Sequence, residues 1–359
     1  MHTQRLHRKL YALTLAFVLL AGINSCHKKE TDSGTSVTTP GNTFTNPILS
    51  SGPDPWIIQK DRQYYYTHTL GNRIGIWKTT KVSELRNVLY QTIWTAPVAG
   101  NNAKNVWAPE IHFIANKWYV YYTAGSSTDH STQRIFVLEN INTDPTTGTW
   151  TDKGQIGDLA ANVFAIDGTT FNHNGNNYFL WSGKEAAQDN TQHIYIAQMT
   201  NPWTLSTPRQ KISSPNYDWE RRGAPPAINE APQILKGPTG KVFLIYSASG
   251  CWTDDYSLGM LTLKDGGNPL NAADWTKSAT PVFTKNISGG VFGPGHNSFF
   301  KSIDGTEDWI LYHANPAANL GCSDFRNPRI QKFSWHSDGT PNFGTPVSIH
   351  TSLQKPSGE

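Results

Sequence analysis

A pattern of apolar and polar positions recurs five times along the chain. Each copy starts with a polar residue, continues as an extended apolar stretch, turns at Gly, Asn or Asp, and ends in a segment dense in aromatic residues. Two short extended segments joined by such a turn predict a β-hairpin. The five copies begin at Asp54, Glu110, Asp167, Glu230 and His296.

The spacing of the copies indicates how many strands each unit contains. The first residues of successive copies lie 56, 57, 63 and 66 positions apart, which leaves room for one or two strands after each hairpin. Four-stranded sheets repeated at this spacing are typical of propeller blades around a central channel. We therefore predict an all-β fold, a five-bladed β-propeller over residues 44–359. A β-sandwich is the alternative, but it would not explain the fivefold recurrence.

The first 25 residues have the pattern of a signal peptide. A basic region with Arg5, Arg8 and Lys9 precedes an apolar run, residues 10–21, which is too short to span a bilayer comfortably. Cys26 follows a small residue directly after this segment, which resembles a bacterial lipoprotein signal whose Cys becomes the lipidated first residue. An ordinary secretory signal with an incidental Cys is the alternative.

Residues 26–43 predict a flexible tether, because they are rich in Ser, Thr and Gly and lack hydrophobic periodicity. We expect an exported protein, lipid-anchored to the bacterial cell envelope, that meets a membrane only through this anchor. In an oxidising compartment, Cys251 and Cys322 form a disulfide or remain as two buried thiols. Both follow the aromatic strand of neighbouring repeats, which favours the disulfide.

Composition narrows the classes of partner. Charged residues make up 16% of the chain and aromatic residues 12%, with 13 Trp. This balance favours strands and suits sugar binding, because a sugar ring presents an apolar face of C–H bonds to an aromatic ring. Without the three basic residues of positions 1–25, the 30 basic residues become 27 and equal the 27 acidic ones. A neutral mature chain gives no indication of a nucleic-acid partner.

The repeat also predicts a site. In a propeller the first strand of each blade lines the channel, so we expect the first residues of the copies to share one position there. Four of these five residues are carboxylic acids, and His296 is the fifth. Carboxylates gathered at one end of a channel repel each other and cost stability, which favours a functional site.

Paired carboxyl groups across a pocket are the minimal equipment for hydrolysis of a glycosidic bond. One must be protonated to donate to the leaving oxygen, and the other must be ionised to activate water. A third carboxylate near the acid can raise the pKa of that acid. Nothing in this chemistry requires a cofactor.

Five motifs resemble glycoside hydrolase family 43 over essentially the whole mature chain. They are residues 46–48 leading to Asp54-Pro55, residues 107–110, Asp167 at the start of its repeat, residues 230–232, and residues 293–297. The resemblance implies a five-bladed propeller that inverts the anomeric carbon. It implies that Asp54 is the general base, Glu230 the general acid, and Asp167 the carboxylate that tunes and orients the acid. Inversion needs a water molecule between base and sugar, so we expect the two carboxyls about 6.5–9.5 Å apart.

The resemblance extends to further residues around the expected pocket. Glu110 is expected to contact substrate or to have a structural role. His296 resembles a channel histidine that in many members holds a metal ion, usually calcium, through water. Arg329 is the candidate for an arginine that reaches substrate or acid, with Arg326 as its rival. Trp107 and Trp252 are the expected aromatic walls of the pocket.

Residues 321–326 and 328–333 look most like the arabinofuranosidase branches of the family. The predicted function is therefore an exo-acting α-L-arabinofuranosidase on arabinan or arabinoxylan. A β-xylosidase and an endo-arabinanase are alternatives with the same fold. A non-catalytic glycan-binding lipoprotein is less favoured, because all three carboxylates of the motif are present.

Overall fold

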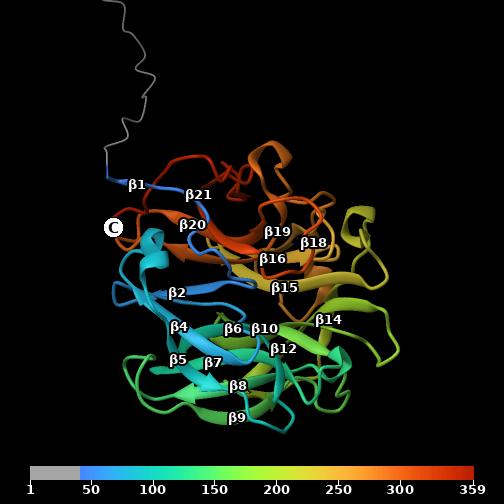
Figure 1. Cartoon of the computed structure of the whole chain (residues 1–359). Coiled ribbons are helices and arrows are strands. Elements are labelled where there is room, and N and C mark those ends of the chain that lie inside the picture. Colours follow the sequence, from blue (N-terminus) through green and yellow to red (C-terminus); the bar gives the residue numbers. More distant parts are fainter. Residues whose placement is uncertain (1–40) are drawn as a thin grey trace, which may run out of the picture. The chain divides into compact units, whose positions relative to one another are not determined.

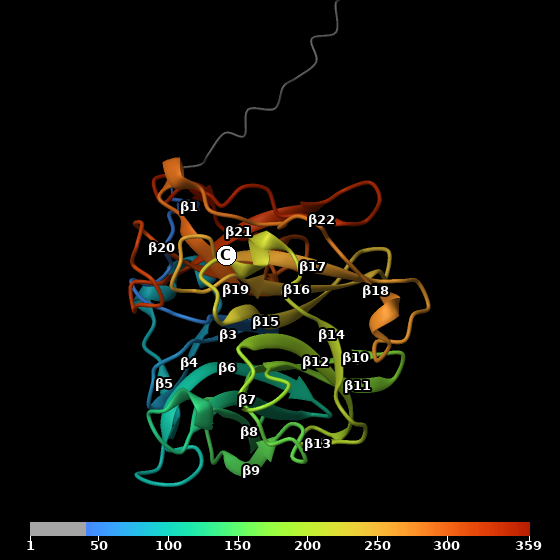
Figure 2. The same cartoon turned by 90° about the vertical axis from the view of Figure 1, so that its right-hand side faces the viewer.

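The computed structural model describes residues 41–359, which form an all-β structure (Figure 1, Figure 2). The predicted signal peptide, Cys26 and most of the predicted tether lie outside the described residues. Within residues 41–359, no helix has the length and hydrophobicity that a membrane span requires. The helices described there are short 3₁₀ turns: η1 (Val82–Asn87), η2 (His130–Thr132), η3 (Asp218–Arg221), η4 (Ala272–Asp274) and η5 (Ile287–Gly289).

Most strands fall into five antiparallel groups that follow one another along the chain. The first group comprises β2 (Trp56–Lys60), β3 (Gln63–Thr67), β4 (Arg73–Thr79) and β5 (Gln91–Thr95). The second comprises β6 (Lys104–Ile114), β7 (Lys117–Gly125), β8 (Arg134–Asn140) and β9 (Thr151–Ile156). The third comprises β10 (Ala165–His173), β11 (Asn176–Gly183), β12 (Thr191–Asn201), β13 (Thr204–Leu205) and β14 (Gln210–Ser213).

The last two groups repeat the arrangement. The fourth comprises β15 (Ala227–Lys236), β16 (Val242–Ala248), β17 (Ser257–Leu263) and β18 (Trp275–Lys277). The fifth comprises β19 (Phe292–Lys301), β20 (Asp308–Asn315), β21 (Asn327–Trp335) and β22 (Pro341–Asn342). A short parallel pairing between β12 and β15 joins the third and fourth groups into one nine-stranded sheet.

In the first three groups, a tight two-residue turn explains why the first two strands pair. Asp61 and Arg62 connect β2 to β3, and both have positive φ (51° and 57°). Asn174 and Gly175 connect β10 to β11 in the same way (51° and 81°). Two central residues with positive φ match the twist of the flanking strands, and Asn and Gly tolerate this conformation best. The predicted hairpins are thus present.

The hydrophobic core is divided into five clusters, and each lies between two neighbouring groups of strands. Four clusters connect consecutive groups, and the fifth connects the first group to the last through residues such as Tyr66 and Leu311. Successive residues of one strand point to opposite faces of the sheet and belong to different clusters, as Tyr64 and Tyr65 do in β3. Because both faces of the sheets are buried, the strands read as continuous apolar runs.

The two ends of the described region meet beside the fifth group. β1 (Thr43–Phe44) pairs with β23 (Leu353–Gln354), so the first and last described strands form a two-stranded sheet. Asn46 continues this connection, because its amide side chain donates to the carbonyl of Ile330 and accepts from its N–H. These bonds tie the start of the described region to the strand β21.

Candidate active site

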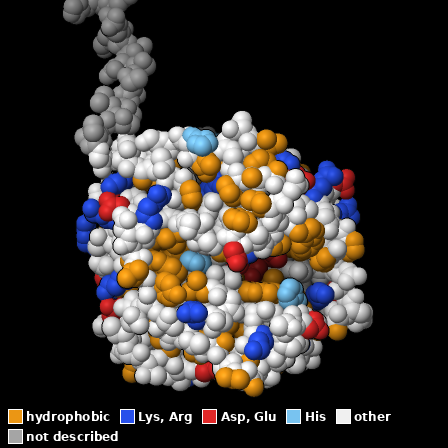
Figure 3. All heavy atoms as spheres, viewed as in Figure 1, with side chains coloured by type: hydrophobic (Ala, Val, Ile, Leu, Met, Phe, Trp, Pro, Cys, Tyr) orange, Lys and Arg blue, Asp and Glu red, His pale blue; other side chains and the backbone are white. Residues whose placement is uncertain are grey.

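A pocket of about 650 Å³ opens where the first strands of the groups meet. Each first strand contacts the first strand of the next group, and β19 contacts β2. Figure 3 shows a hollow with acidic side chains at its bottom and hydrophobic side chains around it. The pocket volume is within the range of small-molecule sites. Its lining includes Asp54, Asp167, Glu230, Trp107, Trp252, His296 and Arg326.

A backbone irregularity positions these side chains. One residue in each group has positive φ and lies two positions before a paired residue of the first strand. In four groups an extra residue interrupts the strand pairing at this point, which is a β-bulge. Residues other than glycine rarely adopt positive φ. Its recurrence at one position in all five groups therefore indicates a conformation that the fold uses to place these side chains. The five residues are Asp54 (57°), Ala108 (43°), Asp167 (57°), Ala231 (49°) and His296 (47°).

This register corrects the expected alignment of the repeats. The residue equivalent to Asp54 in the second group is Ala108, two positions before Glu110. In the fourth group it is Ala231, one position after Glu230. Side chains therefore enter the pocket from two adjacent positions. Glu230 and Trp107 reach it from the position before the residue of positive φ, whereas Asp54 is itself that residue.

Glu110 is not part of the pocket lining. It is 2% exposed, its Oε2 lies 3.0 Å from His112 Nε2, and its Oε1 accepts from Gln233 Nε2. Its carboxylate is therefore engaged within the protein. This corrects the expectation of a substrate contact and supports the structural role.

Asp54 is held as a carboxylate by its neighbours. Its Oδ1 accepts from Arg326 Nη1 at 3.0 Å, and its Oδ2 accepts from Thr69 Oγ1 at 2.7 Å. Its backbone N–H donates to His313 Nδ1 at 3.0 Å. Burial alone would raise the pKa of Asp54, but the charge of Arg326 and the other donors hold it well below its usual value. Asp54 therefore stays ionised below the pH at which an ordinary aspartate takes up a proton.

Glu230 is in the opposite electrostatic situation. Burial raises its pKa to about 7; the hydrogen bond from Tyr256 lowers it, and the Asp54 charge adds to the rise. Burial and the charge of Glu230 also raise the pKa of Asp167 well above its usual value, although Ala231 N donates to Asp167 Oδ2 at 3.0 Å. Because Glu230 and Asp167 oppose each other's ionisation, the pair retains a proton into the neutral range.

Two histidines lie against Asp54. His296 Nδ1 is 3.4 Å from Asp54 Oδ1, and the ring of His313 lies beside that of His296 with centroids 5.9 Å apart. Burial lowers the pKa of both, in His313 well below the usual value. Neutral His313 can accept the Asp54 N–H at Nδ1, which protonated His313 could not.

Aromatic walls and a disulfide form the rim. Trp107 and Trp252 both line the pocket, and Trp252 is 42% exposed. The ring of His130 packs edge-on against Trp107 with centroids 4.8 Å apart. Cys251 and Cys322 form a disulfide that also lines the pocket and links the loop of Trp252 to the loop of Arg326.

Arg326, not Arg329, is the arginine of the pocket. Arg329 is fully buried, donates to Asn327 Oδ1 at 2.8 Å and to the carbonyl of Gly290, and does not line the pocket. The reason is strand geometry: Arg329 lies within β21, paired with Tyr312 of β20, whereas Arg326 precedes the strand. The expectation that Arg329 reaches the substrate is therefore corrected in favour of its rival.

The surroundings of His296 allow a hydrated ion but not an all-protein calcium shell. Calcium prefers six to eight oxygen ligands, whereas His296 offers nitrogen and the oxygens of Asp54 are engaged by Arg326 and Thr69. The neighbouring Asn297 is fully buried, and neither atom of its amide has a partner among the described residues. An ion held largely through water is compatible with this set.

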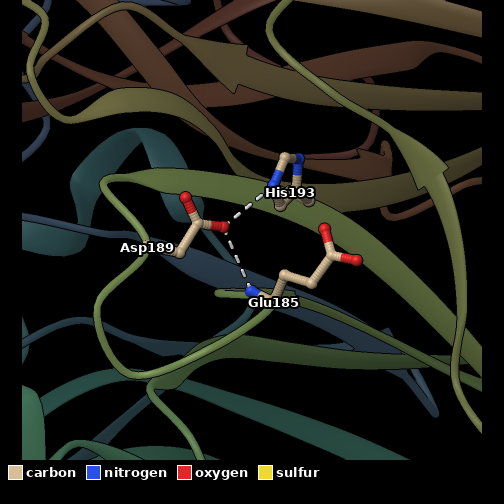
Figure 4. A group of neighbouring side chains, drawn as sticks. All are labelled: Glu185, Asp189 and His193. Atoms are coloured by element: carbon tan, nitrogen blue, oxygen red, sulfur yellow. Dashed lines mark hydrogen bonds and ion pairs between the residues drawn. The ribbon is translucent and has the colours of Figure 1, made fainter.

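A second group of possible ligands lies away from the expected channel site. Glu185, Asp189 and His193 bring three ligand atoms within 4.8 Å of one another, from the loop after β11 and from β12 (Figure 4). The figure shows Asp189 bonded to His193 and to the backbone of Glu185. Lys211 Nζ binds Glu185 Oε2 at 2.7 Å, so a cation already neutralises this cluster.

Several residues around the site carry no signal in a single sequence. Thr69 lies in the pocket and joins Asp54 Oδ2 to the N–H of Ala108. His68 also lines it, and burial lowers its pKa to about 4. Tyr256, directly before β17, contacts Glu230 within the fourth group, and His313 of β20 contacts Asp54 from the fifth group. His68 and Thr69 directly follow an aromatic strand, but the other two become recognisable only once the chain is folded.

Comparison with known proteins places the chain in one family. A sequence model described as glycosyl hydrolases family 43 matches residues 44–341. An extracellular exo-alpha-(1->5)-L-arabinofuranosidase of Streptomyces avermitilis is 42% identical over 322 residues, which cover 88% of this chain and 66% of that protein. A protein of the same name from Streptomyces chartreusis is 41% identical over 275 residues, covering 76% of this chain and 82% of that one.

A solved structure agrees with these relatives. The alpha-L-arabinofuranosidase from Lactobacillus brevis superposes with a TM-score of 0.81 at 36% identity, covering 86% of this chain and 98% of that one. This chain spans about two thirds of the length of the Streptomyces avermitilis relative. The carboxylate pocket, the matched residues 44–341 and these similarities show that the chain belongs to family 43 of the glycosyl hydrolases.

Proposed function

We propose that the protein is an exo-acting α-L-arabinofuranosidase that removes terminal arabinose from arabinan or arabinoxylan with inversion. The observation that carries this proposal is the gathering of Asp54, Asp167 and Glu230 in one pocket. Glycoside hydrolysis requires one ionised and one protonated carboxyl. The low pKa of Asp54 suits the ionised one, and the raised pKa of Glu230 suits the protonated one. The names of the Streptomyces and Lactobacillus relatives support the sugar.

In this mechanism Asp54 is the general base and Glu230 the general acid. Asp54 removes a proton from a water molecule whose oxygen bonds to the anomeric carbon. The bond from that carbon to the leaving oxygen breaks, and the proton of Glu230 passes to the leaving oxygen. Arg326 and Thr69 keep Asp54 ionised and oriented, and Asp167 is coupled to Glu230, because each of these two carboxyls opposes the ionisation of the other.

We propose a five-bladed β-propeller as the architecture that builds this site. The five core clusters, the cyclic contacts of the first strands and the fivefold positive φ support it. Each blade then contributes its residue of positive φ to one end of the central channel. Because these positions come from different blades, the acid and the base stand on separate sheets.

The substrate assignment is tested by product analysis on linear and branched arabinan. An exo-acting enzyme releases free arabinose from the first turnovers, whereas an endo-arabinanase releases oligosaccharides first. Hydrolysis of p-nitrophenyl α-L-arabinofuranoside, but not of the β-D-xyloside, is the expected preference. Turnover of the xyloside alone would overturn the arabinose assignment, and binding without turnover of any substrate would indicate a glycan-binding protein.

We also propose that the chain is exported and lipid-anchored through Cys26. The basic and apolar pattern of residues 1–25 and the word extracellular in the names of both Streptomyces relatives support export. Metabolic labelling with a fatty acid should mark the full chain and not Cys26→Ser. Equal labelling of both would contradict the anchor.

For the channel, we propose an ion held through water near His296 as a structural element outside the chemistry. The unpartnered amide of buried Asn297 supports it. Removal of divalent ions by a chelator should lower the melting temperature, and calcium should restore it. An unchanged melting temperature together with no calcium in the purified protein would contradict this role.

A further inference from the structure

Tyr256 is a buried tyrosine whose hydroxyl reaches the candidate acid. It is 1% exposed and lies directly before β17. Its hydroxyl donates to Glu230 Oε1 at 2.8 Å. Among the described residues no donor reaches the other oxygen, Oε2, so the two oxygens of this carboxyl have different surroundings.

The direction of this hydrogen bond is fixed by its neighbours. The backbone N–H of His296 can only donate, and it donates to Ser247 Oγ at 2.8 Å. The Ser247 hydroxyl lies close enough to Tyr256 to lower the pKa of the tyrosine hydroxyl, and because its oxygen already accepts from His296, its own proton is free to point to the tyrosine oxygen. The proton of Tyr256 is left to point at Glu230 Oε1. The chain of donors thus runs one way, from the bulge of the fifth group to Glu230.

The ring of Tyr256 is held in place by its packing against His313 and Gly295. It stacks on His313, with centroids 5.8 Å apart and planes 11° apart. A Cβ atom at Gly295 would lie 2.2 Å from Tyr256 Cε1, so only glycine at position 295 leaves room for the ring. His313 in turn accepts the N–H of Asp54. One side of this stack therefore holds the acid, and the other holds the backbone of the base.

We propose that Tyr256 is a positioning residue for the general acid, which confines the acidic proton of Glu230 to Oε2 and fixes the carboxyl in the pocket. The inference rests on the proposed function, because it needs Glu230 to be the acid. An Oε1 that accepts from Tyr256 cannot readily carry the proton as well. The proton then resides on Oε2, the oxygen without a protein donor, and is available to the leaving oxygen.

The same hydrogen bond affects the pH dependence. Donation to Oε1 stabilises the ionised form of Glu230, so its loss raises the pKa of Glu230. The acid is active when protonated, and activity is lost as pH rises through this pKa. Loss of the bond therefore moves the alkaline limb to higher pH. His313 stacks on Tyr256, and the other titratable groups that line the pocket with Glu230 are Asp54, Asp167, Asp324, Arg326, His68, His130 and His296.

The test is the pH profile of kcat/KM for Tyr256→Phe, which removes the hydroxyl and keeps the ring on His313. We expect the alkaline limb to move to higher pH by about 1 unit. A hydrogen bond to a charged group stabilises the ionised carboxyl by enough to lower its pKa by about this amount. We expect kcat to fall about 10-fold on an arabinose disaccharide and less on the p-nitrophenyl arabinoside, whose leaving group needs little protonation. KM should change little.

Tyr246→Phe is the matched control. Tyr246 is also buried and its hydroxyl donates at 2.8 Å to a buried carboxylate, but that carboxylate, Glu220, does not line the pocket, whereas Glu230 does. This variant should lose stability without moving the alkaline limb. If Tyr256→Phe did not fold, Ser247→Ala would replace it, with a smaller shift in the same direction because Tyr256 becomes a weaker donor.

The outcomes separate this inference from the proposed function. An active wild type, an inactive Glu230→Gln variant and an unchanged limb in Tyr256→Phe would overturn the role of Tyr256 and leave the proposed function intact. An equal loss on both substrates, without a shift of the limb, would also overturn it. A wild type that hydrolyses no arabinoside would instead overturn the proposed function.

Discussion

Two buried glutamates, ten positions apart in the chain, have pKa values shifted in opposite directions. Glu220 is fully buried, and its two oxygens accept from Lys277, Tyr246, the Asn229 amide and two backbone N–H groups. Burial alone would raise its pKa, but Lys277 and these donors lower it below the usual value. Glu230 accepts one hydrogen bond, from Tyr256, and its pKa is raised to about 7.

The difference shows that partners, more than burial, decide what a buried carboxyl does. Glu220 has a cation at 2.7 Å and enough donors to remain charged, which fits a structural role between β15, β16 and β18. At the pocket the cation, Arg326, is bonded to Asp54 instead, and Glu230 lies near a second carboxyl, Asp167. One pocket can therefore hold an ionised carboxylate and a protonated carboxyl at the same pH.

The strongest test of this contrast exchanges each glutamate for glutamine. Glu230→Gln should lower kcat on an arabinose disaccharide by about 10²–10⁴-fold, the usual contribution of a general acid, with a stable fold. Glu220→Gln should leave kcat within a few-fold and cost about 3 kcal/mol of unfolding free energy, because it leaves Lys277 without its buried counter-charge. Kinetics and urea unfolding of both variants measure the two effects. Comparable kcat values in the two variants would contradict the claim that Glu230 acts in catalysis and Glu220 does not.

The placement of the pocket cation can be tested next. Arg326→Gln removes the charge that keeps Asp54 ionised, so the pKa of Asp54 rises. Activity needs the ionised base and is lost as pH falls through this pKa; the acid limb of kcat/KM should therefore move upward, with about a 100-fold loss at neutral pH. Arg329→Gln is the matched control, and it should reduce stability and leave the acid limb in place. A shift in Arg329→Gln alone would reverse the assignment of the two arginines.

Replacement of the third carboxyl, Asp167, is expected to have the smallest effect of these substitutions. Asp167→Asn keeps an oxygen for the N–H of Ala231 but removes the carboxyl whose ionisation opposes that of Glu230. The pKa of Glu230 should fall, and the alkaline limb of kcat/KM should move down by about 1 pH unit, opposite to the shift expected for Tyr256→Phe. Profiles of both variants in one buffer series provide the measurement. An upward shift in Asp167→Asn would show that Asp167 does not raise the proton affinity of the acid.

Much of the fold could be predicted from the sequence, because it depends on local signals. Aromatic strands and turns such as Asn174-Gly175 mark each hairpin within a few residues. The alignment between repeats was less accurate, because it followed acidic residues. Proline gave a better signal: Asp54, Ala108 and Ala231 each precede a proline, and these are three of the five residues of positive φ.

The candidate site divides in the same way. Asp54, Asp167, Glu230, His296 and both tryptophans were predicted to line the pocket, and all of them do. Arg326 and Arg329 differ by three positions, and only the start of β21 decides which reaches the pocket. Such contacts depend on where a strand begins and on side chains from other sheets. They cannot be read from a single sequence.

The pH dependence of kcat/KM for the wild-type protein on an arabinose disaccharide tests the central claim most directly. The account predicts one descending limb near pH 7, where Glu230 loses its proton, and no ascending limb until well below the usual pKa of an aspartate. Glu230→Gln should abolish the descending limb along with most of the activity. An ascending limb near pH 4, or a profile without a descending limb near pH 7, would contradict the assignment of Asp54 as base and Glu230 as acid.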